Sequence, residues 1–279
     1  MSFIIGLDIG GTKIDGIFVR NGKILRNEKI ATPRSRKAFL KSLEALIYRL
    51  KGENKLTGIG IACAGLIEAR TATILKSPNL KFLEKLRLAE IISKKFRVRI
   101  GIDNDTHCFL RGEQAFGLAR GKKNVVALTL GTGVGGAVLI SGKILQGSHV
   151  SAAELGHMVI NGRNESVEDL CSSHFFEQYK LGGALTVQRA AEKGNKKAKL
   201  IYKEFGQNLG VALANLVNIF DPELIILGGG IARGAHLFMR ETSKEMAKYS
   251  LVPRRFLPQI SLSKLKHAGA LGATKNAQF

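Results

Sequence analysis

Phe3-Ile4-Ile5-Gly6-Leu7-Asp8-Ile9-Gly10-Gly11-Thr12-Lys13 joins an apolar run, an acidic residue and a double glycine near the start of this chain. The run Phe3 to Ile9 is typical of a β-strand. Further strands are expected at Lys13–Val19 and Lys23–Ala31, because Asn21-Gly22 is a strong hairpin signal between them. The glycines leave backbone N–H groups open to an anion. The segment therefore predicts a strand, loop, strand unit whose loop can hold phosphate.

Outward from this unit, strands and helices alternate, which favours mostly parallel sheets with covered faces. A helix over Ser35–Leu50 precedes a strand over Gly58–Ala62, and a helix over Leu83–Phe96 precedes a strand over Val98–Asp103. The later elements expected are strands at Val125–Leu130, Ala137–Ile140, Glu223–Leu227 and Leu257–Leu262, and helices at Lys199–Phe220, from Gly230 to about Tyr249, and from His267. We predict an α/β protein of two lobes.

The boundary between the two lobes is expected near Leu118–Lys123, where the first strand and helix set ends and the second begins. This places an N-terminal α/β lobe at residues 1–118 and a C-terminal α/β lobe at residues 119–279. The last helix is free to pack back on the first lobe.

Two more glycine-rich segments follow predicted strands, Leu130-Gly131-Thr132-Gly133-Val134-Gly135-Gly136 and Leu227-Gly228-Gly229-Gly230. A single glycine turn is more often structural. Three of them at strand ends in one chain are much harder to explain as structural turns alone, and they favour loops that approach phosphate. The sequence has neither a GxxxxGK[ST] loop nor a GxGxxG turn from strand to helix, so P-loop and dinucleotide-binding folds are disfavoured.

Two short polar motifs are candidates for chemistry. Asn104-Asp105 ends a predicted strand and opens a helix, which places a carboxylate beside a positive helix N-terminus. The alternative is that one of the two residues only caps the helix. Glu154 and His157 are three apart, so a helical turn would put both on one face. Taken alone, they are equally well a surface glutamate and a hydrogen-bonded histidine.

Composition limits the classes of function. The chain has 279 residues, 43 Lys and Arg against 22 Asp and Glu, and a net charge of +21. The basic residues are spread along the chain without interleaved aromatics, so we expect a solvated basic surface that favours anionic substrates rather than a nucleic-acid partner. No apolar run reaches the roughly 18 residues of a membrane span.

The three cysteines, Cys63, Cys108 and Cys171, are far apart and form no CxxC pair. They indicate no disulfide framework and fit a reducing compartment. Together with the lack of an apolar span, this predicts a cytoplasmic protein without a membrane partner.

In the order of its segments the sequence resembles the ROK sugar kinases, within the group of hexokinases, actin and heat-shock ATPases. The resemblance is strongest at Gly6–Gly11, Asn104–Glu113, Leu130–Gly136, Glu154–His157 and Leu227–Gly230. It implies the two-lobed actin-like ATPase (ribonuclease H-like) fold with a cleft between the lobes. The three glycine segments would be the phosphate 1, phosphate 2 and adenosine loops, and the stretch from His267 to Ala273 a connecting helix.

The resemblance also implies roles for residues. Asp105 would be the general base, and Asp8 would face Mg²⁺ directly or through water. The residues implied for ATP, besides Asp8, are Gly10, Gly11, Thr12, Lys13, Gly131, Thr132, Gly133, Gly135, Gly228, Gly229 and Gly230. Those implied for the sugar are Gly65, Asn79, Asn104, Glu154, His157 and Glu168.

One departure from the family concerns zinc. ROK kinases usually follow the E-x-G-H histidine with a C-x-C-G-x-x-G-C loop that binds zinc, whereas here Asn161 to Val167 runs directly into Glu168. Cys171, His157 and His174 fall short of the four ligands that a structural zinc requires. We therefore expect no structural zinc, and a segment held by packing instead.

The function implied is ATP-dependent phosphorylation of a hexose, at the 6-hydroxyl as in a glucokinase, or of an N-acetylhexosamine, by a homodimer. Alternatives are a sugar-sensing ROK-type regulator, a non-catalytic sugar- or nucleotide-binding protein, and a kinase that uses polyphosphate as donor. The regulator is disfavoured because the chain begins at the phosphate 1 strand, without room for an N-terminal DNA-binding domain.

Overall fold

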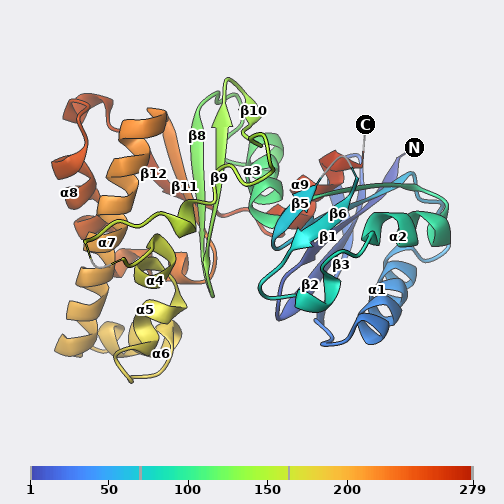
Figure 1. The fold of residues 1–279 in the computed structure, drawn as a ribbon, viewed down its shortest axis with the longest axis horizontal. Helices are drawn as coiled ribbons and strands as arrows, with labels where there is room; N and C mark the ends of the chain where they lie inside the picture. The colour runs from blue at the N-terminus through green and yellow to red at the C-terminus, as the bar shows by residue number, and fades with distance from the viewer. Residues whose placement is uncertain (1, 69–70, 163, 278–279) are drawn as a thin grey trace. The chain divides into compact units, whose positions relative to one another are not determined.

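The computed structural model describes residues 2–68, 71–162 and 164–277. The chain divides into two compact units, labelled by their elements in Figure 1. The first unit is formed by Met1–Arg120, Gln146–Ala152 and Lys264–Phe279, and the second by Gly121–Leu145 and Ala153–Ser263. Each unit has its own five-stranded sheet and its own apolar core, so the protein is α/β as predicted.

The sheet of the first unit has the strand order β3-β2-β1-β4-β7. Strand β1 (Phe3–Ile9) pairs antiparallel with β2 (Lys13–Arg20) and parallel with β4 (Gly58–Cys63), which pairs parallel with β7 (Arg99–Asn104). Every residue of β4 is buried, as expected for a central parallel strand with an uninterrupted apolar sequence. The edge strand β3 (Lys23–Ala31) is polar and largely exposed.

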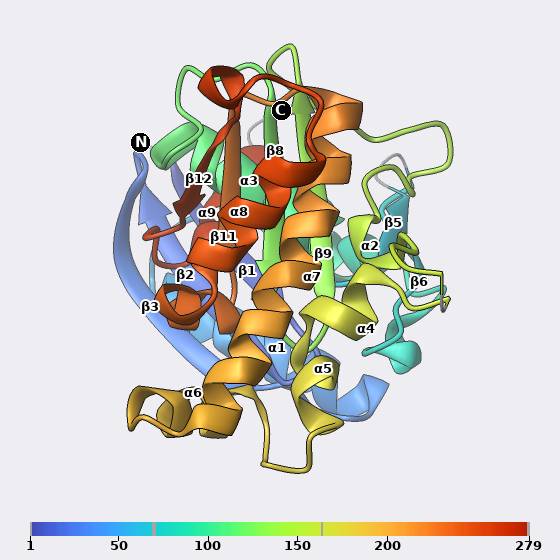
Figure 2. The same ribbon diagram turned by 90° about the vertical axis from the view of Figure 1, so that its left-hand side faces the viewer.

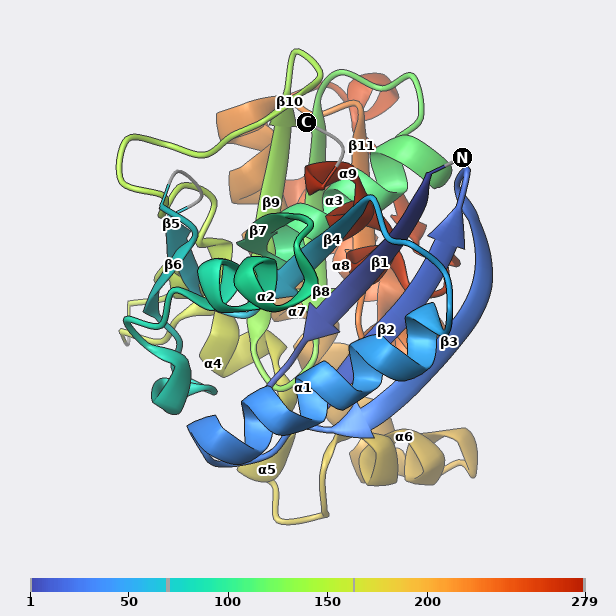
Figure 3. The same ribbon diagram turned by 90° about the vertical axis from the view of Figure 1, so that its right-hand side faces the viewer.

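Helices cover both faces of this sheet, as Figure 3 shows. On one face lie α1 (Arg36–Lys51) and α2 (Leu88–Phe96), and on the other lie α3 (Asp105–Phe116) and α9 (Ala268–Asn276). The buried side of α1 has helical spacing and consists of Phe39, Leu43, Leu46, Ile47 and Leu50. Ser35 caps this helix, since its hydroxyl accepts a hydrogen bond from the N–H of Ala38.

A row of glycines, which we call the glycine row, brings α9 close to the sheet. Gly6 of β1 lies opposite Gly60 of β4, which lies opposite Gly101 of β7. A Cβ atom at any of these three positions would overlap the backbone of α9. The α9 residues met are, in the same order, Ala270, Ala273 and Asn276. Because these are three apart, the helix contacts about one glycine per turn as it crosses the three strands.

The sheet of the second unit has the order β10-β9-β8-β11-β12. Strand β8 (Val125–Leu130) forms an antiparallel hairpin with β9 (Val134–Ile140) and pairs parallel with β11 (Leu224–Gly228). The outer strands are β10 (Lys143–Ile144) and β12 (Gln259–Leu262). The predicted strand, loop, strand theme therefore occurs once in each unit.

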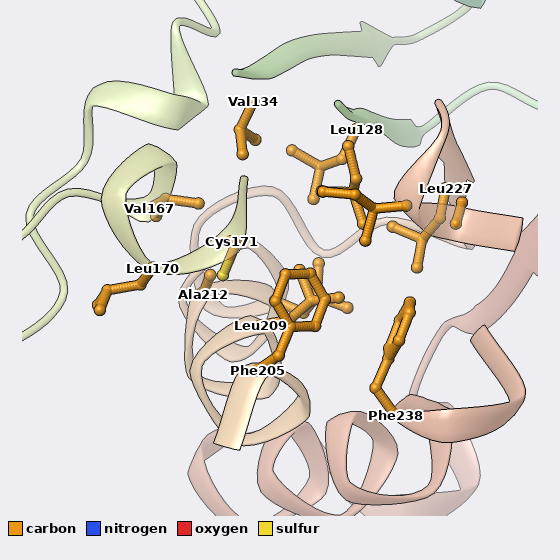
Figure 4. Close-up of a cluster of buried hydrophobic side chains, with 14 of the residues drawn as sticks. Leu128, Val134, Val167, Leu170, Cys171, Phe205, Leu209, Ala212, Leu227 and Phe238 are labelled. Carbon is orange, nitrogen blue, oxygen red and sulfur yellow. The ribbon is translucent and has the colours of Figure 1, made fainter. Parts of the chain in front are cut away.

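Helices α7 (Lys196–Phe220) and α8 (Met239–Tyr249) pack together beside this sheet, as Figure 2 shows. Phe205 and Leu209 of α7 lie in the core with Leu128 and Leu227 of the sheet (Figure 4). The short helices of the unit are α4 (Val167–Cys171), α5 (Ser173–Glu177) and α6 (Ala184–Glu192).

Two predicted helices are shorter than expected. The helix predicted over Leu83–Phe96 begins only at Leu88, after the 3₁₀ turn η1 (Lys81–Leu83), because Lys85 has a φ of 60° that a right-handed helix cannot contain. The helix predicted from Gly230 to Tyr249 is divided into the 3₁₀ segment η3 (Ile231–Leu237) and α8. Non-helical torsions at Gly234 interrupt it further.

The sequence pattern also missed a small hairpin, β5 (Leu66–Glu68) and β6 (Thr73–Lys76), which follows β4. Its strands are too short to show an alternation of apolar and polar residues. Other predicted elements lie within a few residues of their expected bounds. In the described part of the chain, no helix has the length and apolarity needed to cross a membrane.

We expect Gly60→Ala to lower the free energy of unfolding by about 2 kcal/mol or more, because the added methyl group overlaps the α9 backbone at Ala273. Denaturant unfolding measures this. The matched control is Gly183→Ala, where an added Cβ meets nothing within 4 Å, and it should change stability by less than about 0.5 kcal/mol. If both variants behave alike, the glycine row does not set the position of α9.

Candidate active site

A row of acidic side chains crosses the first sheet beside the glycine row. Asp8 of β1 lies opposite Asp15 of β2 and Ala62 of β4, and Ala62 lies opposite Asp103 of β7. Residues in register point to the same face of a sheet. The three aspartates therefore share the face that α3 and α9 cover.

Asp8 sits against the first turn of α9. A Cβ on Gly269 would lie 2.6 Å from Asp8 Oδ2, so only glycine lets the helix start so close to the carboxylate. Burial raises the pKa of Asp8 from 3.8 to about 7, and the charges of Asp105 and Asp15 add to this effect. Lys13 acts in the opposite direction. Among the described residues, none forms an ion pair with Asp8.

Asp15, by contrast, has two basic partners. Its Oδ2 lies 2.8 Å from His267 Nδ1 and 3.4 Å from Lys29 Nζ. His267 precedes α9 and has a φ of 58°. Like charges directly opposite each other on a sheet are destabilising, so these two partners offset the repulsion between Asp15 and Asp8.

The Asn104-Asp105 pair has divided roles at the junction of β7 and α3. Asn104 caps the helix, because its Oδ1 accepts hydrogen bonds from the N–H groups of Thr106 at 2.8 Å and His107 at 3.1 Å. Its Nδ2 donates to the carbonyl of Gly65 at 3.0 Å. Asp105 is therefore not the cap but the first residue of α3.

Asp105 is half-buried, and burial raises the pKa of its carboxyl. Hydrogen bonds from the backbone, including that of the Thr106 N–H at 3.0 Å, and the charge of His107 oppose this rise. The carboxylate has no ion-pair partner in the described part of the chain. It thus remains available to act on another group.

The remaining candidates of the first unit gather at the same end of the sheet. The N–H of Gly10 donates to the carbonyl of Lys13 at 3.0 Å and closes the predicted phosphate 1 turn, and Thr12 and Lys13 are exposed. A Cβ on Gly11 would lie 2.9 Å from Asn79 Cβ, so this turn abuts Asn79. Gly65 has a φ of 123°, and a Cβ there would overlap the backbone of Lys76.

In the second unit the two glycine loops lie side by side. Gly229 has a φ of 88°, and a Cβ there would overlap the backbone of Leu130 at the end of β8. The loop that follows β8 is closed by the N–H of Gly131, which donates to the carbonyl of Gly133 at 3.0 Å. Thr132 and Gly230 belong to these two loops, whereas Gly135 lies in β9 and Gly228 is the last residue of β11.

Helices α4 and α5 hold the loop that follows β8. Ser173 donates its N–H to the carbonyl of Gly131 at 2.9 Å, and Glu168 Oε2 accepts from the N–H of Val134 at 2.9 Å. A Cβ on Gly133 would collide with the Glu168 carboxylate. Glu168 was predicted as a sugar ligand, and the structure places it against the phosphate 2 loop. A sugar contact by Glu168 stays a prediction.

Glu154 caps and His157 ends a 3₁₀ turn, η2 (Leu155–His157), and the N–H of His157 donates to the carbonyl of Glu154 at 3.1 Å. The turn lies against β9, since a Cβ on Gly156 would overlap the carbonyl of Val134. This close approach explains the glycine of the E-x-G-H motif.

Hydrogen bonds, not packing alone, hold the segment that replaces the zinc loop. Asn161 Nδ2 donates to Glu165 Oε2 at 2.5 Å, and the N–H of Glu165 donates to Asn161 Oδ1 at 3.2 Å. Ser166 and Asp169 form a capping box at the start of α4. The segment is thereby joined to η2, because the N–H of Val167 donates to the carbonyl of Met158 at 2.8 Å.

Cys171 is not near a metal-binding arrangement. Its side chain is fully buried in the apolar core of the second unit, near Leu209 and Ala212 (Figure 4), and burial raises the pKa of its thiol. Across residues 2–68, 71–162 and 164–277, no three His, Cys, Asp or Glu side chains form a group that could hold a metal ion.

The sequence pattern gave no role to two members of the acidic row, Asp15 and Asp103, or to their partners, which are His267 for Asp15 and His107 and Arg111 for Asp103. One signal was present for Asp15. Strand alternation across the predicted hairpin puts it on the same face as Asp8.

The profile of the ROK family matches residues 4–278 of this chain. Among curated proteins, glucokinase of Streptomyces coelicolor is 29% identical, over 89% of this chain and 88% of its own. N-acetyl-D-glucosamine kinase of Photobacterium profundum is 28% identical, over 98% and 97%. Among solved structures, a ROK family glucokinase from Streptomyces griseus in complex with glucose and AMPPNP is 26% identical, with a TM-score of 0.84 and coverage of 99% of both chains.

We expect Asp8→Asn to gain stability relative to the unsubstituted protein as the pH rises. Between pH 3.8 and about 7 the folded protein holds the Asp8 proton that the unfolded chain releases, so ionisation opposes folding. Asparagine removes this cost. Denaturant unfolding in the presence of a chelator should show a difference of about 1–3 kcal/mol in favour of the variant at pH 7.5 and little at pH 4.5. A difference independent of pH would contradict the assigned environment of Asp8.

We expect metal analysis of the purified protein to find no stoichiometric zinc, because the zinc loop is replaced by the hydrogen-bonded turn of Asn161 and Glu165. Plasma emission spectrometry, before and after dialysis against a chelator, measures this. One zinc per chain would show that the turn is not a metal-free substitute.

Proposed function

This chain belongs to the ROK family and is a carbohydrate kinase, and we propose that it transfers the γ-phosphoryl group of ATP to a hydroxyl of a hexose or N-acetylhexosamine. For a hexose, the acceptor would be the 6-hydroxyl. The observation that carries the proposal is Asp105, a carboxylate at the start of α3 that has no ion-pair partner among the described residues, while Asn104 serves as the N-cap of the helix.

Asp105 has the properties of a general base. Its burial raises its proton affinity, while the backbone and His107 keep it ionisable. A carboxylate tuned in this way can accept the proton of a sugar hydroxyl as the oxygen attacks phosphorus, which contributes about 10²- to 10⁴-fold of rate. Asn104 links Gly65, a proposed sugar contact, to the start of α3, which carries Asp105. The sugar and the general base would therefore be held in a fixed position relative to each other.

Mg²⁺ fits the carboxylate of Asp8, which would hold it directly or through water. Asp8 offers a hard oxygen ligand without an ion-pair partner among the described residues, and its raised pKa reflects a site where a cation would lower the electrostatic cost. The ion would supply charge neutralisation to the phosphates of ATP.

Backbone N–H groups account for phosphate binding in this proposal. The N–H groups of Gly11, Thr12 and Lys13 would serve one part of the triphosphate, because that of Gly10 already donates to Lys13. Those of Thr132 and Gly133 would serve another part, and adenosine would lie at Gly228–Gly230. The sugar would contact Gly65, Asn79, Asn104, Glu154, His157 and Glu168. The Streptomyces griseus structure with glucose and AMPPNP supports this assignment of donor and acceptor classes. A homodimer in the cytoplasm completes the proposal.

We expect Asp105→Ala and Asp105→Asn to lower kcat by about 10²-fold or more, with sugar affinity within about tenfold, as loss of a general base requires. A coupled assay with ATP and a panel of hexoses and N-acetylhexosamines measures this. Asp221→Asn is the control, because Asp221 ends α7 in the left-handed conformation that asparagine tolerates.

Near-normal turnover of the Asp105 variants would refute the role of Asp105. Polyphosphate is tested as donor in the same assay. Sugar binding by the unsubstituted protein without transfer from either donor would contradict the kinase and favour a sensing role.

A further inference from the structure

The proposed reaction uses Asp8 and Asp105 but leaves unexplained a group of charged side chains at the end of β7. Asp103 is 5% exposed, and its carboxylate contacts His107 and Arg111 of α3. We call these three residues the Asp103 network. Residues 107 and 111 are four apart, so both lie on the side of α3 that faces the end of β7.

The hydrogen bonds of the Asp103 carboxylate join it to the cap and to the first two turns of α3. Its Oδ1 accepts the backbone N–H of Asn104 at 2.8 Å and lies 3.0 Å from His107 Nδ1, and its Oδ2 accepts from Arg111 Nη2 at 3.0 Å. Burial alone would raise the pKa of Asp103, but the hydrogen bonds and charges of His107 and Arg111 hold it below its ordinary value.

Stability is a weak reason for such a network. Burying charges costs desolvation that their attraction often fails to repay, and apolar residues of similar volume commonly do as well. His107 is 5% exposed, so at least two of the three members are buried. The Asp103 network is therefore better explained by where it lies in the fold than by its contribution to stability.

The network is tied to Asp105 through Asn104. Asp103 holds the backbone N–H of Asn104, whose side chain accepts the N–H of His107 at 3.1 Å. His107 is thus anchored to β7 by its ring and to the cap by its backbone. The residue between these anchors and directly after the cap is Asp105.

We propose that Asp103, His107 and Arg111 form a positioning network, which fixes Asp105 at the start of α3 and places positive charge beside its carboxylate. The inference rests on the proposed function of Asp105 as general base. Against the burial of Asp105, the charge of His107 favours the ionised carboxylate, which is the form that accepts a proton.

Three further titratable groups lie around the junction of β7 and α3. The titratable groups that bear on Asp105 or on the network are Asp8 of β1, Cys63 of β4, and Cys108 of α3. Helix α9 packs against α3 with small residues, and its Lys275 lies over the ring of Phe116, 5.0 Å from the centroid. His107 is therefore the basic side chain whose charge acts on Asp105, and Arg111 acts on Asp103.

Two substitutions of His107 distinguish its hydrogen bond to Asp103, which positions α3, from the effect of its ring charge on Asp105. His107→Asn keeps a side-chain N–H near the place of Nδ1 but removes the ring charge. We expect its plateau kcat within about threefold of the unsubstituted protein, with the acid limb of the kcat/KM profile moved up by about 0.5 pH unit, because loss of a nearby cation raises a carboxyl pKa. His107→Ala also loses the hydrogen bond to Asp103, and we expect plateau kcat to fall about tenfold while KM for the sugar changes less than about threefold.

Arg111→Met keeps the length of the side chain and removes its hydrogen bond to Asp103, so it should reproduce part of the His107→Ala loss. His236→Asn is the matched control. His236 is mostly exposed and pairs only with Glu192 at 3.3 Å in the second unit, so neither kcat nor the pH profile should change.

The inference fails if His107→Ala lowers only the melting temperature and leaves plateau kcat and the acid limb unchanged, since that is the result of a merely structural role. A direct readout does not need turnover. The ¹³Cγ resonance of Asp105, assigned with Asp105→Asn, should titrate at higher pH in His107→Asn than in the unsubstituted protein. If the titration midpoint of Asp105 is the same in His107→Asn and in the unsubstituted protein, the proposed network is wrong. If the midpoint rises in His107→Asn but the unsubstituted protein phosphorylates no sugar, only the proposed function is wrong.

Discussion

The close approach of α9 to the glycine row is the constraint on which the candidate site depends. Without side chains at Gly6, Gly60 and Gly101, the helix backbone rests on the sheet, and its first turn meets Asp8 through Gly269. Helix α3 is placed by the same device, because a Cβ on Gly112 would overlap the backbone of α9. These glycines cost conformational entropy on folding, and the close contacts that they permit bring the start of both helices to the acidic row.

The carboxylates at this site differ in whether they have basic partners. Asp15 and Asp103 of the row each contact a histidine and one further basic side chain. Asp8 of the row, and Asp105 at the start of α3, have no ion-pair partner among the described residues. Pairing at both ends of the row lets the three aspartates and Asp105 lie close together at a tolerable cost. The two unpaired carboxylates are those with raised pKa values.

Local pattern predicted the parts that depend on local chemistry. Alternation and Asn21-Gly22 were enough for β1 to β3, and glycines after apolar runs marked the three loops. The start of α2 was missed because a single left-handed residue, Lys85, is invisible to apolar periodicity. The hairpin of β5 and β6 was missed because short strands show no period.

Charged partners distant in sequence were beyond prediction for a different reason. His267 contacts Asp15 only because α9 packs against the first sheet. The sequence around either residue gives no sign of this contact. His107 and Arg111 have the spacing of any exposed helix face, and only the register of β7 buries them against Asp103. Family resemblance assigned Glu168 to the sugar, while its hydrogen bond to Val134 depends on how α4 packs.

The most direct test of the account is a crystal structure with a hexose, Mg²⁺ and a non-hydrolysable ATP analogue. We predict an Asp105 carboxylate oxygen within about 3.2 Å of the acceptor hydroxyl, with the first turn of α9 still seated on Asp8. A carboxylate turned away from the sugar, with another side chain at that hydroxyl, would contradict the account.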